Sequence, residues 1–195
     1  MTTSYRVERR VDVRVPMRDG VELSTDIFLP RDAGRCPAVL LRTPYSNNNE
    51  QLIDKGVRLA SAGYACIIQD VRGRWDSGGD YYPFLHEADD GFDTQQWIGA
   101  QDFSDATVGT AGASYLGTTQ WRSAPLGSQF LKCMVPRVIC TDYHSGLLYP
   151  GGALQLNVAM TWGMRTHAHT GQDIDFHQWS EAFRHLPLQD IDKAA

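Results

Sequence analysis

The sequence has no long hydrophobic run and no cluster of basic residues. No apolar stretch approaches the roughly 20 residues that a membrane-spanning helix needs, and the first residues, MTTSYRVE, lack the apolar core of a signal peptide. We therefore expect no membrane partner and a cytoplasmic location. Lys and Arg number 18 against 23 Asp and Glu, a net charge of −5, and the basic residues are scattered. Nucleic acid is not an expected partner, because its phosphates require clustered cations.

Cysteine is also scarce. The four cysteines, Cys36, Cys66, Cys133 and Cys140, show no C-x-x-C pairing. A chain of this length with so few cysteines is not typical of a disulfide scaffold, and a zinc site needs closer ligand spacing. Because most of them lie within apolar segments, we expect reduced thiols in the core, and we expect neither a metal nor a cofactor.

What is present indicates a globular enzyme or binding domain. The hydrophobic fraction is 42%, with five Trp and eight Tyr among 195 residues. A chain of this length holds one domain of about 150 residues plus an appendage.

Strand and helix patterns alternate through most of the chain. Alternating apolar and polar residues at 11–17 and 21–30, around the turn at 18–20, predict an antiparallel hairpin. Further strands are predicted at 38–41, 64–69, 108–113 and 133–140, and helices at 50–62, 87–100 and 115–125. This order predicts an α/β fold, a mostly parallel sheet with helices on both faces that begins with the hairpin.

From about Leu147 the pattern changes. Gly151 and Gly152 interrupt the chain, and two helices rich in His and Trp are predicted at 153–164 and 175–183.

The segment from Val108 to Gly117 predicts a strand, a sharp turn at Ser114 and a helix. Small residues before the serine allow a strained turn that presents its hydroxyl, the geometry of a nucleophile elbow. The backbone N–H of Tyr115 then points to where an oxyanion develops, and the helix dipole adds positive potential there. The spacing departs from G-x-S-x-G, since Gly117 comes one residue later. Taken alone, G-x-S also fits an ordinary turn.

Four other motifs accompany this one, in the order MRDGV at 17–21, RTPY at 42–45, QDVRGR at 69–74 and DGFDT at 90–94. Together the five motifs resemble those of the cocaine-esterase and Xaa-Pro dipeptidyl-peptidase superfamily of α/β-hydrolases. The resemblance covers about residues 11 to 165. It implies an α/β-hydrolase core, placed at 1–146, and the beginning of a helical cap at 147–195, with the boundary between 143 and 150.

The resemblance also implies roles for three residues. Ser114 is the expected nucleophile, and the oxyanion is held by the Tyr45 hydroxyl and the Tyr115 N–H. Tyr45 follows a buried strand, at the sheet edge where ligands of α/β folds collect. Without the resemblance, Tyr45 also fits a half-buried loop tyrosine.

The expected function is therefore hydrolysis of an ester or amide through an acyl-enzyme on Ser114. A small-molecule ester or a short peptide-like molecule is the expected substrate, and oligomer formation is left open. Xaa-Pro dipeptidyl peptidase is an alternative, although no anchor for a free amino terminus can be recognised. α-Amino-acid ester hydrolase is another, and a non-catalytic remnant or complementing fragment is the alternative of a different class.

The base that would activate Ser114 is not evident. A serine needs a histidine oriented by a carboxylate, and in α/β-hydrolases the chain order is Ser, Asp or Glu, then His. His144 comes too early in this order, and none of the later histidines matches the family pattern. These later residues are His167, His169, His177 and His185. We therefore expect the triad Asp and His beyond Ala195, and an N-terminal fragment that is almost inactive alone.

Two polar stretches have competing interpretations. The loop from Asp70 to Gly79 contains Gly and Arg but lacks the lysine and the following helix of a phosphate loop, which favours a structural loop in which Asp70 and Arg72 fix a strand end. The acidic residues Glu87, Asp89, Asp90 and Asp93 fit a metal site or a helix start. We favour the helix start, where the dipole stabilises carboxylates.

Overall fold

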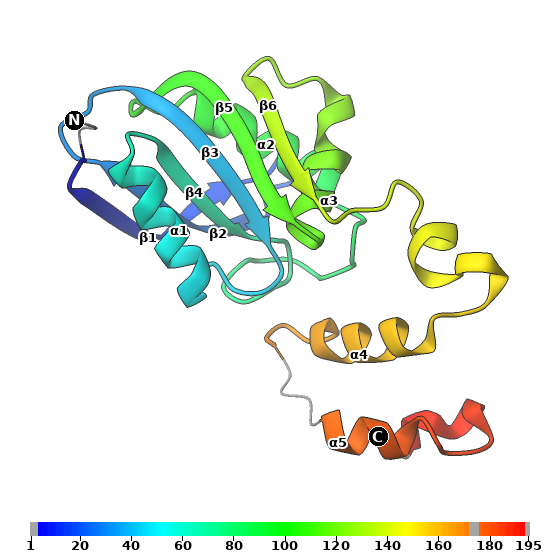
Figure 1. Cartoon of the computed structure of the whole chain (residues 1–195). Helices are drawn as coiled ribbons and strands as arrows, with labels where there is room; N and C mark the ends of the chain where they lie inside the picture. The colour runs from blue at the N-terminus through cyan, green and yellow to red at the C-terminus, as the bar shows by residue number, and fades with distance from the viewer. Residues whose placement is uncertain (1–3, 172–175, 194–195) are drawn as a thin grey trace. The chain divides into compact units, whose positions relative to one another are not determined.

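Six strands form one sheet in the order β1-β2-β4-β3-β5-β6 (Figure 1). The computed structural model describes residues 4–171 and 176–193. The strands are β1 (Val7–Pro16), β2 (Glu22–Pro30), β3 (Cys36–Thr43), β4 (Ala65–Asp70), β5 (Ser104–Ala113) and β6 (Leu131–Arg137). β1 and β2 pair antiparallel, as do β2 and β4, whereas β3, β4, β5 and β6 run parallel. The predicted hairpin and the mostly parallel sheet are confirmed.

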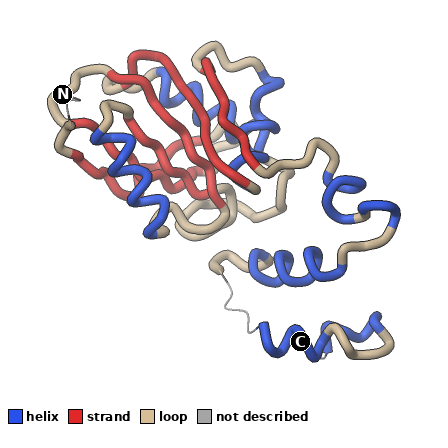
Figure 2. Tube along the Cα trace, in the orientation of Figure 1, coloured by secondary structure: helices blue, strands red, loops and turns tan. Residues whose placement is uncertain are grey.

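Three helices cover the two faces of this sheet (Figures 1 and 2). They are α1 (Glu50–Ser61), α2 (Glu87–Gly99) and α3 (Tyr115–Ser123). Neighbouring residues of one strand point to opposite faces. Ile67 of β4 therefore packs in the cluster that contains Ile98 of α2, while Ile68 packs in the cluster that contains Leu52 of α1. The uniform apolar character of the central strands follows from burial on both faces.

The chain divides into two compact units, Met1–Cys140 and Thr141–Ala195. The second unit contains short helical turns at His144–Leu148, Pro150–Gly152 and Leu188–Lys193, and two helices, α4 (Leu156–Thr166) and α5 (Phe176–Ala182). Trp179, Ala182 and Ile191 form its small core. The two predicted helices are thus present, although residue 175 of the second lies outside the described residues. The assignment of 147–195 as a cap, with its boundary after residue 146, stays a prediction.

The cysteines are all free, but only Cys36 and Cys66 lie in the core. Cys133 is exposed and Cys140 is half-buried. The expectation of a core thiol was wrong for Cys133 and for Cys140. Cys133 lies in β6, the last strand of the described sheet, in which no residue is buried, and Cys140 follows this strand. Within the described part of the chain, no helix combines the length and apolar character that crossing a bilayer requires.

Candidate active site

Ser114 lies at the turn between the end of β5 and the start of α3, as predicted. Its backbone has φ 57° and ψ −126°, a conformation that is strained for any residue with a side chain. The Ser114 N–H donates to the carbonyl of Arg137 at 3.0 Å, and its own carbonyl accepts from the N–H of Gly117 at 2.8 Å. The residue is exposed, and its hydroxyl makes no capping bond to α3. The turn therefore presents the serine side chain outward.

Two glycines explain why the motif has its own spacing. Gly112 has φ 151°, and a Cβ there would lie 2.3 Å from the Cβ of Leu116. At Gly117 a Cβ would lie 2.4 Å from Cγ2 of Ile139 and 3.0 Å from the carbonyl oxygen of Arg137. The first glycine lets the strand meet the helix, and the second lets α3 pack against the chain that leaves β6. The second contact needs a glycine at the third position after the serine.

Tyr45 follows β3, and Ser114 follows β5. Because β3 and β5 are parallel neighbours, Tyr45 and Ser114 lie at the same carboxyl edge of the sheet. The ring is half-buried and packs against the cluster that contains Leu41 and Leu116. Leu116 lies in the first turn of α3, two residues after Ser114. The structure thus brings Tyr45 to the elbow region, while its contact with an oxyanion stays a prediction.

Tyr115 is the first residue of α3, and its N–H belongs to the turn whose amides point out of the helix N-terminus. Its side chain is buried and anchors the helix start. The phenol donates to Oε1 of Glu87 at 2.7 Å and accepts from the N–H of Phe84 at 3.1 Å. The ring stacks on Phe84 with centroids 4.8 Å apart. Burial raises the pKa of Tyr115 far above its usual range, so the phenol stays protonated.

A buried set of arginines and carboxylates lies at the start of α2. Nη1 of Arg42 is 2.7 Å from Oε2 of Glu87, and Nη2 of Arg72 is 2.6 Å from Oδ1 of Asp90. These four side chains are nearly fully buried. Arg72 also bonds Asp19 at 2.7 Å and holds the pKa of that carboxyl below its usual range.

The interpretation of the acidic residues as helix-start charges was incomplete. Glu87 and Asp90 are partners of buried arginines, and Asp89 and Asp93 both bind Arg18 (2.7 and 2.8 Å). The arginines approach from the turn after β1 and from the ends of β3 and β4, which local sequence does not reveal. No group of three metal-ligating side chains occurs among the described residues.

The loop after β4 is structural, as predicted. Oδ1 of Asp70 accepts the N–H of Asn47 at 2.7 Å, and Arg72 joins the ion pairs described above. Arg74 and Trp75 of the same loop both donate to the carbonyl of Pro44 at 3.0 Å. Burial raises the pKa of Asp70 to about 8.

Two histidines of the second unit make local contacts. The ring of His144 stacks on Tyr149 at 4.7 Å, and Nδ1 of His167 lies 2.6 Å from the carbonyl oxygen of Met164. The side chain of His177 lies outside the described residues. The base of Ser114 stays unassigned, and the prediction of a triad Asp and His beyond Ala195 is unchanged.

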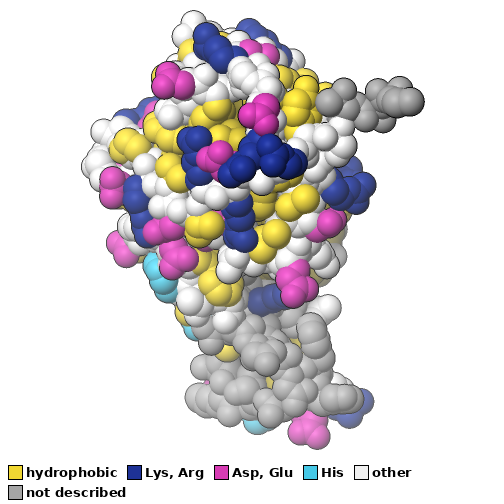
Figure 3. All heavy atoms as spheres, turned by 90° about the vertical axis from the view of Figure 1, so that its left-hand side faces the viewer, with side chains coloured by type: hydrophobic (Ala, Val, Ile, Leu, Met, Phe, Trp, Pro, Cys, Tyr) yellow, Lys and Arg dark blue, Asp and Glu magenta, His cyan; other side chains and the backbone are white. Residues whose placement is uncertain are grey.

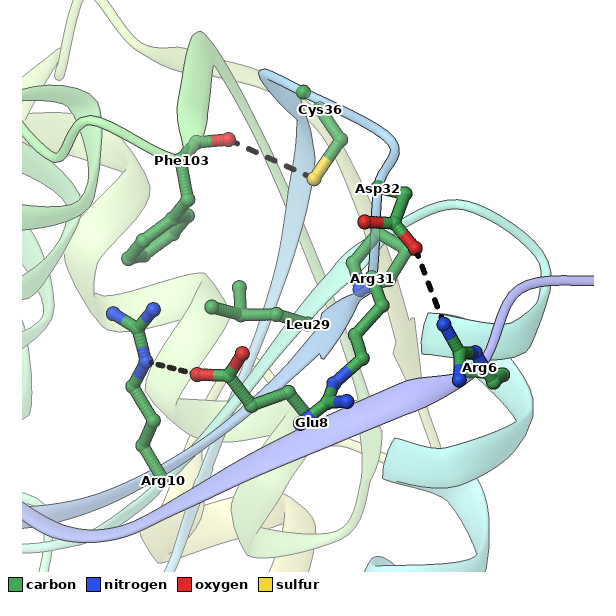
Figure 4. Close-up of a pocket in the computed structure, with 10 residues that line it drawn as sticks. Arg6, Glu8, Arg10, Leu29, Arg31, Asp32, Cys36 and Phe103 are labelled. Atoms are coloured by element: carbon green, nitrogen blue, oxygen red, sulfur yellow. Dashed lines mark hydrogen bonds and ion pairs between the residues drawn. The ribbon is translucent and has the colours of Figure 1, made fainter.

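A cavity of about 360 Å³ lies near the starts of β3 and β5, at the edge of the sheet opposite Ser114 (Figure 4). Its charges are largely paired within it, Arg10 with Glu8 at 2.8 Å and Arg6 with Asp32 at 3.6 Å. The Cys36 thiol there points to the carbonyl of Phe103 at 3.7 Å, and burial raises its pKa, so it is a poor nucleophile. The cavity therefore offers no second reactive centre. On the surface of the molecule, Figure 3 shows basic and acidic side chains interspersed on one face.

Comparison with known proteins decides the family. The sequence model of the X-Pro dipeptidyl-peptidase family (S15) matches residues 19–194 of this chain. The chain belongs to this family. The cocaine esterase of Rhodococcus sp. (strain MB1 Bresler) is 37% identical over an alignment of 156 positions, which covers 77% of this chain and 27% of that protein. A putative serine esterase of Mycobacterium bovis is 27% identical over 190 residues, covering 84% of this chain and 30% of the relative.

Solved structures of two hydrolases share the fold. An α-amino acid ester hydrolase superposes with a TM-score of 0.81 at 29% identity, covering 100% of this chain and 36% of that one. A CocE/NonD family hydrolase of Staphylococcus aureus gives a TM-score of 0.74 at 24% identity, covering 89% and 35%, which supports the fold alone. The fold is that of the CocE/NonD α/β-hydrolases. Because the chain spans only 27% to 36% of these relatives, the activity of a whole protein is a proposal.

Proposed function

We propose that this chain carries the nucleophile and the oxyanion donors of a serine carboxylic ester hydrolase. The observation that supports this most directly is Ser114, exposed on a strained turn between a buried strand and a helix. Strained backbone persists only where the surroundings enforce it, and it gathers at functional sites. Here the surroundings are Gly112, Gly117 and the bond to Arg137.

The reaction follows from the chemistry of a serine hydroxyl. Oγ of Ser114 attacks the carbonyl carbon of the ester while its proton passes to a base, and the carbonyl π electrons move to the oxygen. The Tyr45 hydroxyl and the Tyr115 N–H donate hydrogen bonds to that oxyanion. The tetrahedral intermediate expels the alcohol, which takes the proton from the base. Water then attacks the acyl-enzyme by the same steps and releases the acid and the serine.

An ester is the preferred substrate over an Xaa-Pro peptide. Two matching relatives are named esterases, and one of them is 37% identical to this chain. The family description names X-Pro dipeptidyl-peptidase, and the superposed structure is an α-amino acid ester hydrolase, so both alternatives are kept. The expected substrate is a small-molecule ester or a short peptide-like molecule. The cytoplasmic location stays a prediction.

The test needs a polypeptide that contains residues 1–195 and hydrolyses p-nitrophenyl acetate. The shortest polypeptide that does so is called the active polypeptide. Ser114→Ala should lower kcat by about 10³-fold or more. Ser61→Ala, at the end of α1, is the control and should keep the parent rate. Parallel assays with alanyl-prolyl-p-nitroanilide and with an amino-acid ester distinguish the alternatives. An undiminished rate in Ser114→Ala would refute the proposal.

A further inference from the structure

Two side-chain donors converge on one backbone oxygen next to Tyr45. Nε of Arg74 and Nε1 of Trp75 each lie 3.0 Å from the carbonyl oxygen of Pro44. A carbonyl oxygen has two lone pairs, so the two N–H groups saturate it. The peptide plane between Pro44 and Tyr45 contains this oxygen, and its orientation is therefore set from the loop after β4.

The chain is also held on the other side of Tyr45. The N–H of Asn47 donates to Oδ1 of Asp70 at 2.7 Å, and its side-chain amide donates to Oγ of Ser24 at 3.2 Å. The N–H of Tyr45 itself donates to Oγ1 of Thr43 at 3.0 Å. The segment that carries the Tyr45 ring is thus fixed before, at and after the tyrosine.

Two features of this arrangement are unfavourable in themselves, namely strained backbone and a buried cation. Trp75 has φ 52° and Ser46 has φ 82°, both in the left-handed region that residues with side chains avoid. Arg74 is only 1% exposed, and its guanidinium lies 5.2 Å from the ring centroid of Tyr81. Burying a guanidinium is expensive unless its donors are used. The strained turn at Trp75 and the buried cation at Arg74 meet at the Pro44 carbonyl.

We propose that Arg74 and Trp75 are positioning residues of the oxyanion site, which hold Tyr45 through the carbonyl of Pro44. The inference rests on the proposed role of Tyr45. An oxyanion donor works only when it lies within about 3 Å of the oxygen that becomes charged. Displacing a catalytic group by about 1 Å lowers the rate by up to about 10²-fold. Donors that fix the backbone of Tyr45 therefore act on turnover without touching the substrate.

The test compares variants of the active polypeptide. Trp75→Phe keeps the aromatic ring but loses the N–H donor, and Arg74→Lys keeps the cation but loses the guanidinium Nε. Each should lower kcat by about 10-fold with little change in KM. In a Tyr45→Phe background the same substitutions should change kcat less than about 2-fold, because they act through the missing hydroxyl. Arg72→Lys is the matched control, since Arg72 lies in the same loop but binds Asp19 and Asp90.

The outcomes separate this inference from the proposed function. If Tyr45→Phe alone leaves kcat unchanged, the oxyanion role of Tyr45 fails, and the positioning role fails with it. If Tyr45→Phe lowers kcat, and Trp75→Phe and Arg74→Lys lower it by the same further factor in the Tyr45→Phe background as in the parent, only the positioning role is overturned. The same holds if Arg72→Lys lowers kcat as much as Arg74→Lys does.

A second readout does not depend on activity. With 3-fluorotyrosine placed at position 45 of the 195-residue chain, the ¹⁹F resonance should be a single narrow line. Trp75→Phe should shift and broaden or split this line, while Arg72→Lys should leave it in place. An unchanged line in Trp75→Phe would overturn the inference.

Discussion

The phenol of Tyr115 donates a 2.7 Å hydrogen bond to Oε1 of Glu87, and this bond joins the first residue of α3 to the first residue of α2. The other oxygen of Glu87 accepts from Nη1 of Arg42 at 2.7 Å. Arg42 lies in β3, three residues before Tyr45. A buried chain of polar contacts thus links the residue after Ser114 to the strand that leads to Tyr45.

Removing the charge of Glu87 should destabilise the fold. Glu87→Gln leaves the buried cation of Arg42 without its closest carboxylate, and breaking a buried pair from one side costs about 3 kcal/mol. Urea denaturation followed by far-UV circular dichroism measures the change. Asp54→Asn is the control, because its pair with Arg58 at 3.8 Å is exposed and should contribute less than about 0.5 kcal/mol. Similar losses for the two variants would contradict the structure.

Gly117 should not tolerate alanine. Its added Cβ would meet Ile139 at 2.4 Å, so Gly117→Ala should cost about 1–3 kcal/mol through overpacking. Gly163 of α4 is the matched helical glycine, with nothing within 4 Å of an added Cβ. Gly163→Ala should be neutral, or stabilising by up to about 1 kcal/mol, from helix propensity. Thermal denaturation of both variants checks the prediction, and a neutral Gly117→Ala would remove the packing explanation of the motif's spacing.

The Tyr45 hydroxyl should matter for turnover and not for folding. In the active polypeptide, Tyr45→Phe should lower kcat by about 10²-fold or more, the usual loss for one oxyanion donor. The melting temperature should stay close to that of the parent, since the ring keeps its packing. Steady-state kinetics with p-nitrophenyl acetate measure the effect. An unchanged kcat would return Tyr45 to the role of a half-buried loop residue.

Asp70 should make stability fall as pH rises. Burial, aided by Asp76 and Asp26 and opposed by the Asn47 N–H and Arg74, raises its pKa to about 8. An unfolded aspartate titrates near pKa 3.9. Between about pH 4 and pH 8 the folded state therefore holds a proton that the unfolded state has lost, and unfolding becomes easier as pH rises.

Asp70→Asn resembles the protonated side chain and should remove this dependence. Between pH 5 and pH 8 the unfolding free energy of the parent should fall by about 1 kcal/mol or more beyond the fall measured for Asp70→Asn. Urea denaturation at both pH values checks this expectation. Parallel curves for variant and parent would show that Asp70 is ionised in the folded state.

The sequence predicts local features well and distant pairings poorly. The small residues at 109–113 indicate the turn at Ser114 because strand, turn and helix are neighbours in the chain. The pair of Arg42 with Glu87 joins residues 45 positions apart, and carboxylates at a helix start already have a local explanation. The signal that could have revealed the pair is an arginine in the apolar strand β3, which needs a buried partner. The exposure of Cys133 depends on the place of β6 in the sheet, which its own residues do not specify.

The central claim is that Ser114 is the nucleophile, and a fluorophosphonate tests it most directly. The active polypeptide is treated with the reagent, digested and mapped by mass spectrometry, with the 195-residue chain treated in parallel. We expect one adduct on the peptide that contains Ser114, none in Ser114→Ala, and much slower labelling of the 195-residue chain, which we expect to lack the triad base. Labelling of the 195-residue chain at the full rate would show that one of its own histidines, such as His144, acts as the base. An adduct on another residue, with Ser114 unmodified, would contradict the claim.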